Sequence, residues 1–170
     1  GPIAGDWSIS GPTGKISGGS IAALFRAIVD GTVSSIATKG GASGLLAAHA
    51  FGKLSFKGDA VDLEIITGLD LGDDGAPGGD GAAADSLEGS GDLGGLLVGG
   101  RADGLDVRVG VDPVDGVFGN GDDVVSETPV FRTLKIGGPL SEGSRIVAAV
   151  FPKVSIDGQK IDPTVDSRVD

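Results

Sequence analysis

Apolar residues alternate with small or polar ones along most of this chain, and one phrase of that alternation recurs. The phrase is apolar–x–apolar–x–Gly. Its clear copies end at Gly40, Gly58, Gly100 and Gly138, a degenerate copy ends at Gly18, and Thr38 takes one apolar place. A further apolar residue lies three positions upstream of each clear copy: Val33, Phe51, Leu93 and Phe131. A period of two predicts half-buried strands, and a glycine between two strands predicts a corner.

A second alternating run follows each of these glycines. We expect its apolar side to face the core at Leu45, Ala47, His49, Leu63, Ile65, Thr67, Leu105, Val107 and Val109. The runs after Gly18 and Gly138 are offset by one residue, which predicts inward positions at Leu24, Ile28, Ile146 and Ala148. A repeated strand–corner–strand unit is typical of architectures that bury their apolar face by stacking on neighbouring units.

The spacing of the glycines predicts how many units there are. The intervals are 22, 18, 42 and 38 residues, and a solenoid coil of about 20 residues fits the two short ones. The excess in the long ones falls in segments 69–87 and 111–127, which are rich in Gly and Asp and predict loops. The sequence therefore predicts an all-β fold, a short parallel β-solenoid (β-helix) of about five coils with two insertions. A β-sandwich of short strands is the alternative, and segment 21–29 is the one candidate for a helix.

Composition agrees with a thin core and tight corners, because glycine makes up 33 of 170 residues and aromatic residues only 4%. We expect one domain at 3–161, a polar tail or linker at 162–170, and a remnant of tag removal at 1–2. Cysteine is absent, which excludes disulfides and thiolate metal sites. No signal peptide or transmembrane run is visible, so no membrane insertion is expected.

The charge is −11, from 24 acidic and 13 basic residues. No basic patch is evident along the sequence, which argues against nucleic acid and anionic membranes as partners. The acids gather in the insertions, and like charges this dense are unfavourable unless water or a cation compensates. Calcium suits such Gly-rich loops because it takes six to eight oxygen ligands. The predicted ligands are Asp70, Asp73, Asp74, Asp80 and Asp85 in the first insertion, and Asp112, Asp115, Asn120, Asp122 and Asp123 in the second.

Other chemistry is less well supported by the sequence. The alternative for the acidic loops is plain solvation, and one histidine without cysteine argues against zinc. His49 falls on an inward position of the alternation, which predicts a packed core histidine and not a catalytic one. We expect no enzyme activity, since no Ser/His/Asp grouping can be built around that residue.

Several stretches resemble the repeat regions of very large bacterial cell-surface and secreted proteins, the Gly/Asp-rich, adhesin-like β-solenoid modules. They are LGDDGAPGGDGAAAD (71–85), VGVDPVDGVFGNGDDVV (109–125), LKIGGPLSEGSRIVAAVFP (134–152) and the closing IDGQKIDPTVDSRV. The resemblance implies an extracellular or bacterial cell-surface location, with neighbouring modules of the same polypeptide, and cell-surface glycans, as partners.

These observations predict a non-catalytic structural or adhesion module of a larger bacterial surface or secreted protein, stabilised by calcium. The alternative is a carbohydrate-binding or carbohydrate-active parallel β-helix domain. An enzyme of that kind would need two carboxyl groups held at a fixed separation.

Overall fold

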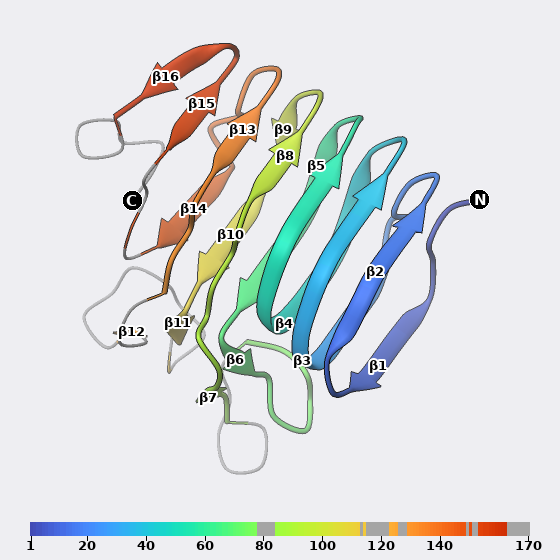
Figure 1. Cartoon of the computed structure of the whole chain (residues 1–170), viewed down its shortest axis with the longest axis vertical. Helices are drawn as coiled ribbons and strands as arrows, with labels where there is room; N and C mark the ends of the chain where they lie inside the picture. Colours follow the sequence, from blue (N-terminus) through green and yellow to red (C-terminus); the bar gives the residue numbers. More distant parts are fainter. Residues whose placement is uncertain are drawn as a thin grey trace.

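The alternating segments form strands that pair mostly in parallel, and the sheet they build curls around one apolar core (Figure 1). The computed structural model describes residues 1–77, 84–112, 114, 123–125, 129–148, 150 and 153–162. Within these residues the fold is all-β, with no helix. A 12-stranded sheet dominates, and two separate strand pairs, β6–β7 and β11–β12, are antiparallel.

The strands vary widely in length. The large sheet contains β1 (Asp6–Ser10), β2 (Thr13–Gly18), β3 (Arg26–Thr38), β4 (Ala42–Phe56), β5 (Ala60–Thr67), β8 (Leu96–Val98), β9 (Ala102–Asp103), β10 (Asp106–Val109), β13 (Leu134–Ile136), β14 (Arg145–Ala148), β15 (Val154–Ile156) and β16 (Gln159–Ile161). The two small pairs are formed by β6 (Leu69–Asp70) with β7 (Ser86–Leu87), and by β11 (Val111–Asp112) with β12 (Val124–Val125).

The recurring phrase forms one side of the curled sheet, which we call limb A: β2, the second halves of β3 and β4, β8, β13 and β15. Equivalent apolar positions pair with one another from strand to strand, in the order Ile16, Ile36, Leu54, Leu96, Leu134 and Val154. The upstream residues Val33, Phe51, Leu93 and Phe131 pair in the same order. The alignment of the phrase copies predicted from the sequence is therefore confirmed.

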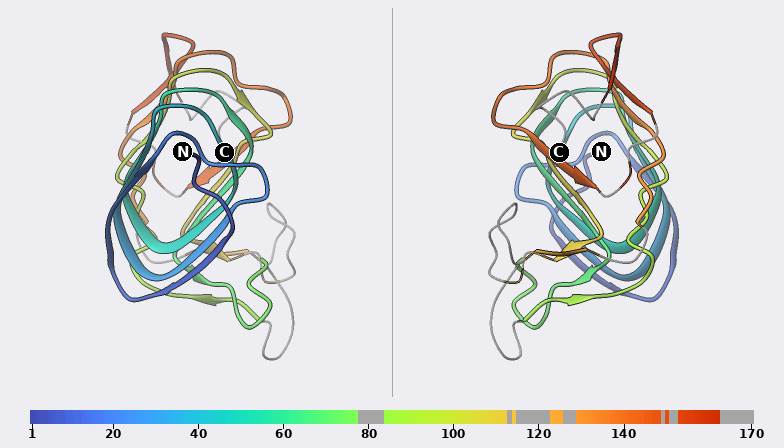
Figure 2. Two further views of the ribbon diagram at one scale, coloured as in Figure 1. Left: turned by 90° about the vertical axis from the view of Figure 1, so that its right-hand side faces the viewer. Right: turned by 90° about the vertical axis from the view of Figure 1, so that its left-hand side faces the viewer.

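The second alternating runs form the opposite side, limb B: β1, the first halves of β3 and β4, β5, β10 and β14. Its core positions pair in the order Trp7, Ala27, Leu46, Ile65, Val107 and Ile146. A short third line of bridges joins Ile3 to Ile21, and Ala42 through Ala60 and Ala102 to Leu140. Seen along the stacking direction, the chain runs from limb to limb in nested loops around the core (Figure 2).

The predicted inward positions are right in the later part of limb B and wrong in the earlier part. Leu63, Ile65, Leu105, Val107, Val109 and Ile146 are buried in the main core, as expected. In β3 and β4 the phase is shifted by one, so that Phe25, Ala27 and Val29, then Leu46 and Ala48, face the core instead. Leu24 has a φ of 62° and is 92% exposed, and Gly44 has a φ of 93° beside a register shift. In both strands the buried positions keep the phase of Ile21 and Ala42. The alternation reverses instead in β5 and β10, where Asp62 and Gly104 have positive φ and the buried positions change from Ala60 to Leu63 and from Ala102 to Leu105.

Two further expectations need correction. Residues 26–29 of the candidate helix belong to strand β3, since their neighbours on both sides offer parallel hydrogen-bonding partners. The start of the first insertion is not a free loop either. Leu69 and Leu71 pack on Ala47 and Ile66, and this second, smaller cluster covers part of the outer surface of limb B.

The glycines that close the phrase lie where successive corners approach each other. A Cβ atom built on Gly58 would lie 2.6 Å from the backbone nitrogen of Gly41. Such a separation is shorter than any van der Waals contact, so the corner accepts no side chain. The prediction of glycine corners is confirmed, with close backbone approach as the physical reason.

Candidate functional site

The first insertion holds four of its predicted calcium ligands within the described residues. Asp70 lies in β6 opposite Ser86, and Asp85 directly precedes β7. Asp73 and Asp74 are exposed in the turn that follows β6, where Asp74 Oδ1 accepts a hydrogen bond from the Ala76 backbone nitrogen at 2.9 Å. Asp80 lies outside the described residues.

The second insertion is described only in part. Asp112 lies in β11 opposite Val124, and its Oδ1 accepts a hydrogen bond from the Val114 nitrogen at 2.9 Å. Asp123 directly precedes β12, while Asp115, Asn120 and Asp122 lie outside the described residues. Where their positions are described, the predicted ligands do not bring three carboxylates together. Calcium binding in the insertions therefore stays a prediction.

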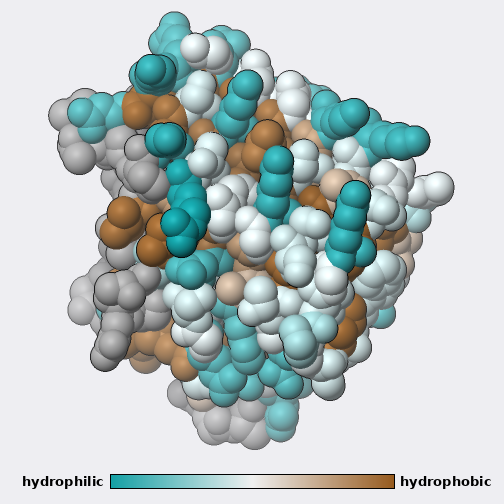
Figure 3. All heavy atoms as spheres, in the orientation of Figure 1, coloured by the Kyte–Doolittle hydropathy of each residue, from teal (hydrophilic) through white to brown (hydrophobic). Residues whose placement is uncertain are grey.

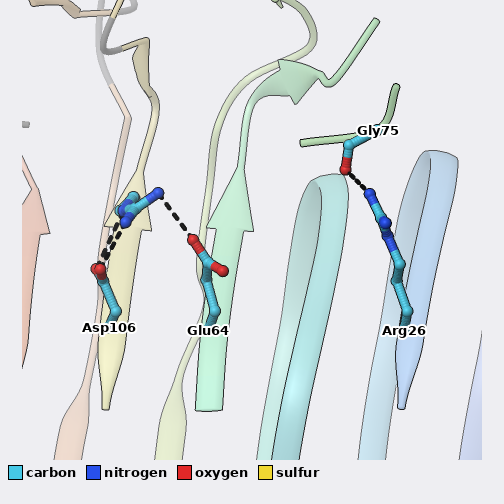
Figure 4. A network of polar contacts seen from close by, with 5 residues as sticks. Arg26, Glu64, Gly75 and Asp106 are labelled. Carbon is cyan, nitrogen blue, oxygen red and sulfur yellow. Dashed lines mark hydrogen bonds and ion pairs between the residues drawn. The ribbon is translucent and has the colours of Figure 1, made fainter. Parts of the chain in front are cut away.

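Arg26 fastens the first insertion to limb B. Its Nη2 donates to the carbonyl oxygens of Asp74, at 3.3 Å, and of Gly75 (Figure 4). The Nε of the same side chain is buried without a hydrogen-bond partner. A shallow hollow of about 370 Å³ separates the turn from the sheet, with Arg26, Glu64 and Leu45 in its lining. The insertion is thus held by hydrogen bonds from Arg26 as well as by the packing of Leu69 and Leu71.

A charged network braces two neighbouring strands of limb B. Glu64 of β5 and Asp106 of β10 are register partners, and Arg108 reaches both (Figure 4). Its Nη1 lies 2.8 Å from Glu64 Oε1, while its Nε and Nη2 donate to the two Asp106 oxygens at 3.1 and 2.6 Å. Burial raises the pKa of Glu64 above its ordinary value; Arg108 opposes this rise and Asp106 adds to it. The planar guanidinium fork suits this two-sided contact better than a lysine would.

His49 is not a packed core residue, and the sequence-based expectation is wrong. Its side chain is 19% exposed, on the outer surface, with Nε2 lying 3.4 Å from Asp30 Oδ1 and 3.3 Å from Glu88 Oε2. One nitrogen and two carboxylate oxygens within 4.8 Å of one another could hold a divalent cation. The inward phase of β4 belongs to Ala48, so His49 points outward to meet carboxylates from β3 and from the segment after β7.

The lysines gather on one face, which the sequence analysis missed. All seven are exposed and lie on, or at the ends of, the limb A strands and β16, and Figure 3 shows hydrophilic side chains projecting from this face. They are Lys15, Lys39, Lys53, Lys57, Lys135, Lys153 and Lys160. No ion pair joins any of them to a carboxylate of the described residues.

The sequence did contain a signal for this face. Lys15 and Lys53 come just before the first apolar residue of a phrase copy, and Lys135 occupies an x position. All three alternate with inward residues, so they share the outer face once the copies are aligned. No comparable signal existed for His49, whose partners come from distant segments.

Comparison with known proteins adds no relative. No family model matches this chain, and no curated protein or solved structure is significantly similar to it. Among the described residues, no helix has the length and apolar character needed to span a membrane.

Proposed function

We propose that this chain is a non-catalytic β-solenoid module of about five coils that belongs to a larger bacterial surface or secreted protein. The observation that carries the proposal is the pairing of equivalent apolar positions across limb A, from Ile16 to Val154. A stack of this kind gains stability turn by turn and presents a rigid surface over its whole length. That property suits a structural or adhesion role, next to further modules of the same polypeptide.

The proposal includes calcium ions bound by the carboxylates of the two insertions. The carboxylates of the two insertions repel one another, and a cation that bridges them would hold each insertion against the stack. Arg26 and the buried Leu69 and Leu71 already fix the first insertion at its base. A site built on this base would stabilise the folded form by about 2.7 kcal/mol at free calcium one hundred times the dissociation constant.

Calorimetric unfolding in calcium, in magnesium and in chelator tests the metal. We expect a rise in melting temperature that is specific to calcium. We also expect the Asp73→Ala/Asp74→Ala double variant to lose most of that rise, in addition to a calcium-independent cost from the lost Asp74–Ala76 hydrogen bond. The matched control is Asp6→Ala/Glu142→Ala, which removes two exposed carboxylates outside both insertions. Equal melting temperatures in calcium and chelator would contradict the metal.

Incubation with acidic and neutral polysaccharides tests the non-catalytic role. We expect the polymer length and the number of reducing ends to stay unchanged over hours at micromolar protein. New reducing ends, absent from a heat-denatured sample, would overturn the proposal in favour of a carbohydrate-active domain.

A further inference from the structure

We propose that the outer face of limb A binds a linear acidic polysaccharide, laid across the strands along the direction in which they stack. This inference extends the proposed adhesion role to a class of ligand. It depends on the stacked strands of limb A and is independent of calcium.

Three hollows on this face form a row. The first, of about 540 Å³, has Lys15, Lys39 and Lys57 in its lining. The second, of about 610 Å³, extends from Lys57 to Lys135, and the third, of about 350 Å³, extends from Lys135 to Lys160. Because Lys57 and Lys135 are each shared by two hollows, we treat the row as one trough that crosses limb A from β2 to β16.

The floor of the trough is one pairing line in which four of the six side chains are short. Ser17, Ala37, Ser55 and Leu97 follow one another from β2 to β8, and Lys135 and Ser155 continue the line. Their small size leaves the space that the lysines enclose. The serine hydroxyls can donate and accept hydrogen bonds, as sugar hydroxyls require, and Leu97 offers an apolar surface to a ring face.

The positive charge of the trough has no partner within the described molecule. None of the residues that line the three hollows is acidic. The acids of limb B project from the opposite side of the core and line none of the hollows. A negative ligand in the trough would therefore contact positive side chains, although the whole chain carries a net charge of −11.

The spacing of the lysines favours a sparsely charged polymer. Three lysines of the trough, Lys15, Lys57 and Lys135, lie on or directly after alternate strands of the pairing order β2–β3–β4–β8–β13, which corresponds to about 10 Å along the stack from one to the next. A sugar unit in an extended polysaccharide advances by nearly one interstrand distance, so this spacing matches one acidic group per disaccharide. Nucleic acid carries one phosphate per about 3.4 Å of each strand, roughly three times as dense.

The trough also lacks the exposed aromatic side chains that proteins use to bind single-stranded nucleic acid. Proteins of that class stack bases on aromatic side chains. Phe56 is the one aromatic residue in the lining of these hollows, and its side chain is buried in the core. Hydroxyl groups, small residues and isolated lysines suit a glycan better.

Calorimetric titration with hyaluronan, which carries one carboxylate per disaccharide, tests the proposal at 0.15 M salt. We expect binding by the full chain, and none of neutral dextran. The Lys57→Gln/Lys135→Gln variant should bind roughly 5- to 30-fold more weakly, since each exposed charge contact contributes a modest amount. The Arg101→Gln/Arg132→Gln variant removes two charges outside the trough and should stay within about twofold. Thermal melts of both variants verify that each is folded.

The following outcomes would overturn the proposal: no hyaluronan binding, an equal loss in the arginine control, or preferred binding of oligo-dT or phosphatidylserine vesicles. Self-association abolished by the lysine substitutions would assign the face to a second copy of this chain instead. These results are separable from the proposed function. Shortening of the hyaluronan would overturn the non-catalytic role and leave the site standing, and the calcium-dependent melting shift is measured without any glycan.

Discussion

At the scale of single residues, His49 is the side chain best placed to bind a metal ion. Its Nε2 lies 3.4 and 3.3 Å from two carboxylate oxygens. Zinc bonds of about 2.0–2.2 Å in a tetrahedron place neighbouring ligand atoms about 3.4 Å apart. Both separations from Nε2 match those of neighbouring tetrahedral ligands, and the ligand atoms of Asp30, His49 and Glu88 all lie within 4.8 Å of one another.

Composition alone argued against zinc, but the structure adds two carboxylates to the one histidine, so we expect zinc to stabilise the protein through His49. Saturating zinc should raise the melting temperature of the native chain, and His49→Gln should abolish the rise, because it removes the one histidine. Asp6→Asn, a carboxylate change away from the cluster, should retain the rise. Differential scanning fluorimetry with zinc and with chelator measures both. An equal shift in His49→Gln would assign the effect to other ligands.

Glu64 has a predictable effect on the pH dependence of stability. Its pKa is raised in the folded state, mainly by burial, so the folded protein holds this proton more tightly than the unfolded chain does. The resulting stabilisation is fully present below the unfolded value of 4.5 and is lost as pH rises through the folded pKa. Relative to Glu64→Gln, the native protein should therefore lose unfolding free energy between about pH 4 and pH 7. Urea unfolding at both pH values tests this. An unfolding free energy of the native protein that rises with pH relative to that of the variant would contradict it.

These two residues mark the limits of prediction from the sequence. Glu64 and Asp106 each lie six residues after the closing glycine of a phrase copy, so alignment of the copies places them opposite each other, as in the structure. The contact of Arg108 with both carboxylates depends on its side-chain conformation, which the alternation does not specify. His49 meets partners from β3 and from the segment after β7. The contacts of His49 come from segments with no matching offset, so that cluster could not be foreseen.

At the scale of elements, the corners allow a sharp test. A Cβ atom on Gly137 would overlap the backbone carbonyl oxygen of Gly99 in the preceding corner, whereas one on Gly143 would meet nothing within 4 Å. Gly137→Ala should destabilise the protein by about 1–3 kcal/mol, the usual cost of forcing atoms into packed structure. Gly143→Ala should remain within about 0.5 kcal/mol of the native chain. Chemical denaturation compares the two, and equal effects would mean that the corners are not tightly packed.

Elements were predicted well wherever alternation ran unbroken. The phrase aligned limb A correctly because each copy keeps a fixed distance between its apolar residues and its glycine. Limb B was placed one residue out of phase in β3 and β4, because the alternation reverses after Ala60 in β5 and after Ala102 in β10 but not in the two earlier strands. Leu24 and Gly44 also have positive φ without such a reversal, and the sequence gave no sign of this difference.

At the scale of the whole molecule, the lysines are concentrated on one side. Arg26 and Arg108 of limb B are held by polar contacts, whereas the seven lysines lie on or beside the strands of limb A and β16, without an ion pair to a described carboxylate. Net charge was computed from composition and could not reveal this arrangement, because it depends on which face each x position occupies. The acidic insertions were recognisable from composition, but their metal-binding geometry was not.

The direction of pairing also determines how the molecule yields to force. Hydrogen bonds between parallel neighbours run along the stack, and β1 and β16 lie at its opposite ends (Figure 1). In the proposed solenoid, tension between the two ends would therefore load the bonds of one turn at a time, by peeling and not by shear. A turn of about 20 residues would release about 70 Å of extended chain, and a turn that carries an insertion about twice that. We expect force–extension traces with short steps from the amino-terminal half and long steps from the carboxy-terminal half. The two insertions would then lengthen the chain that is released when a turn unfolds.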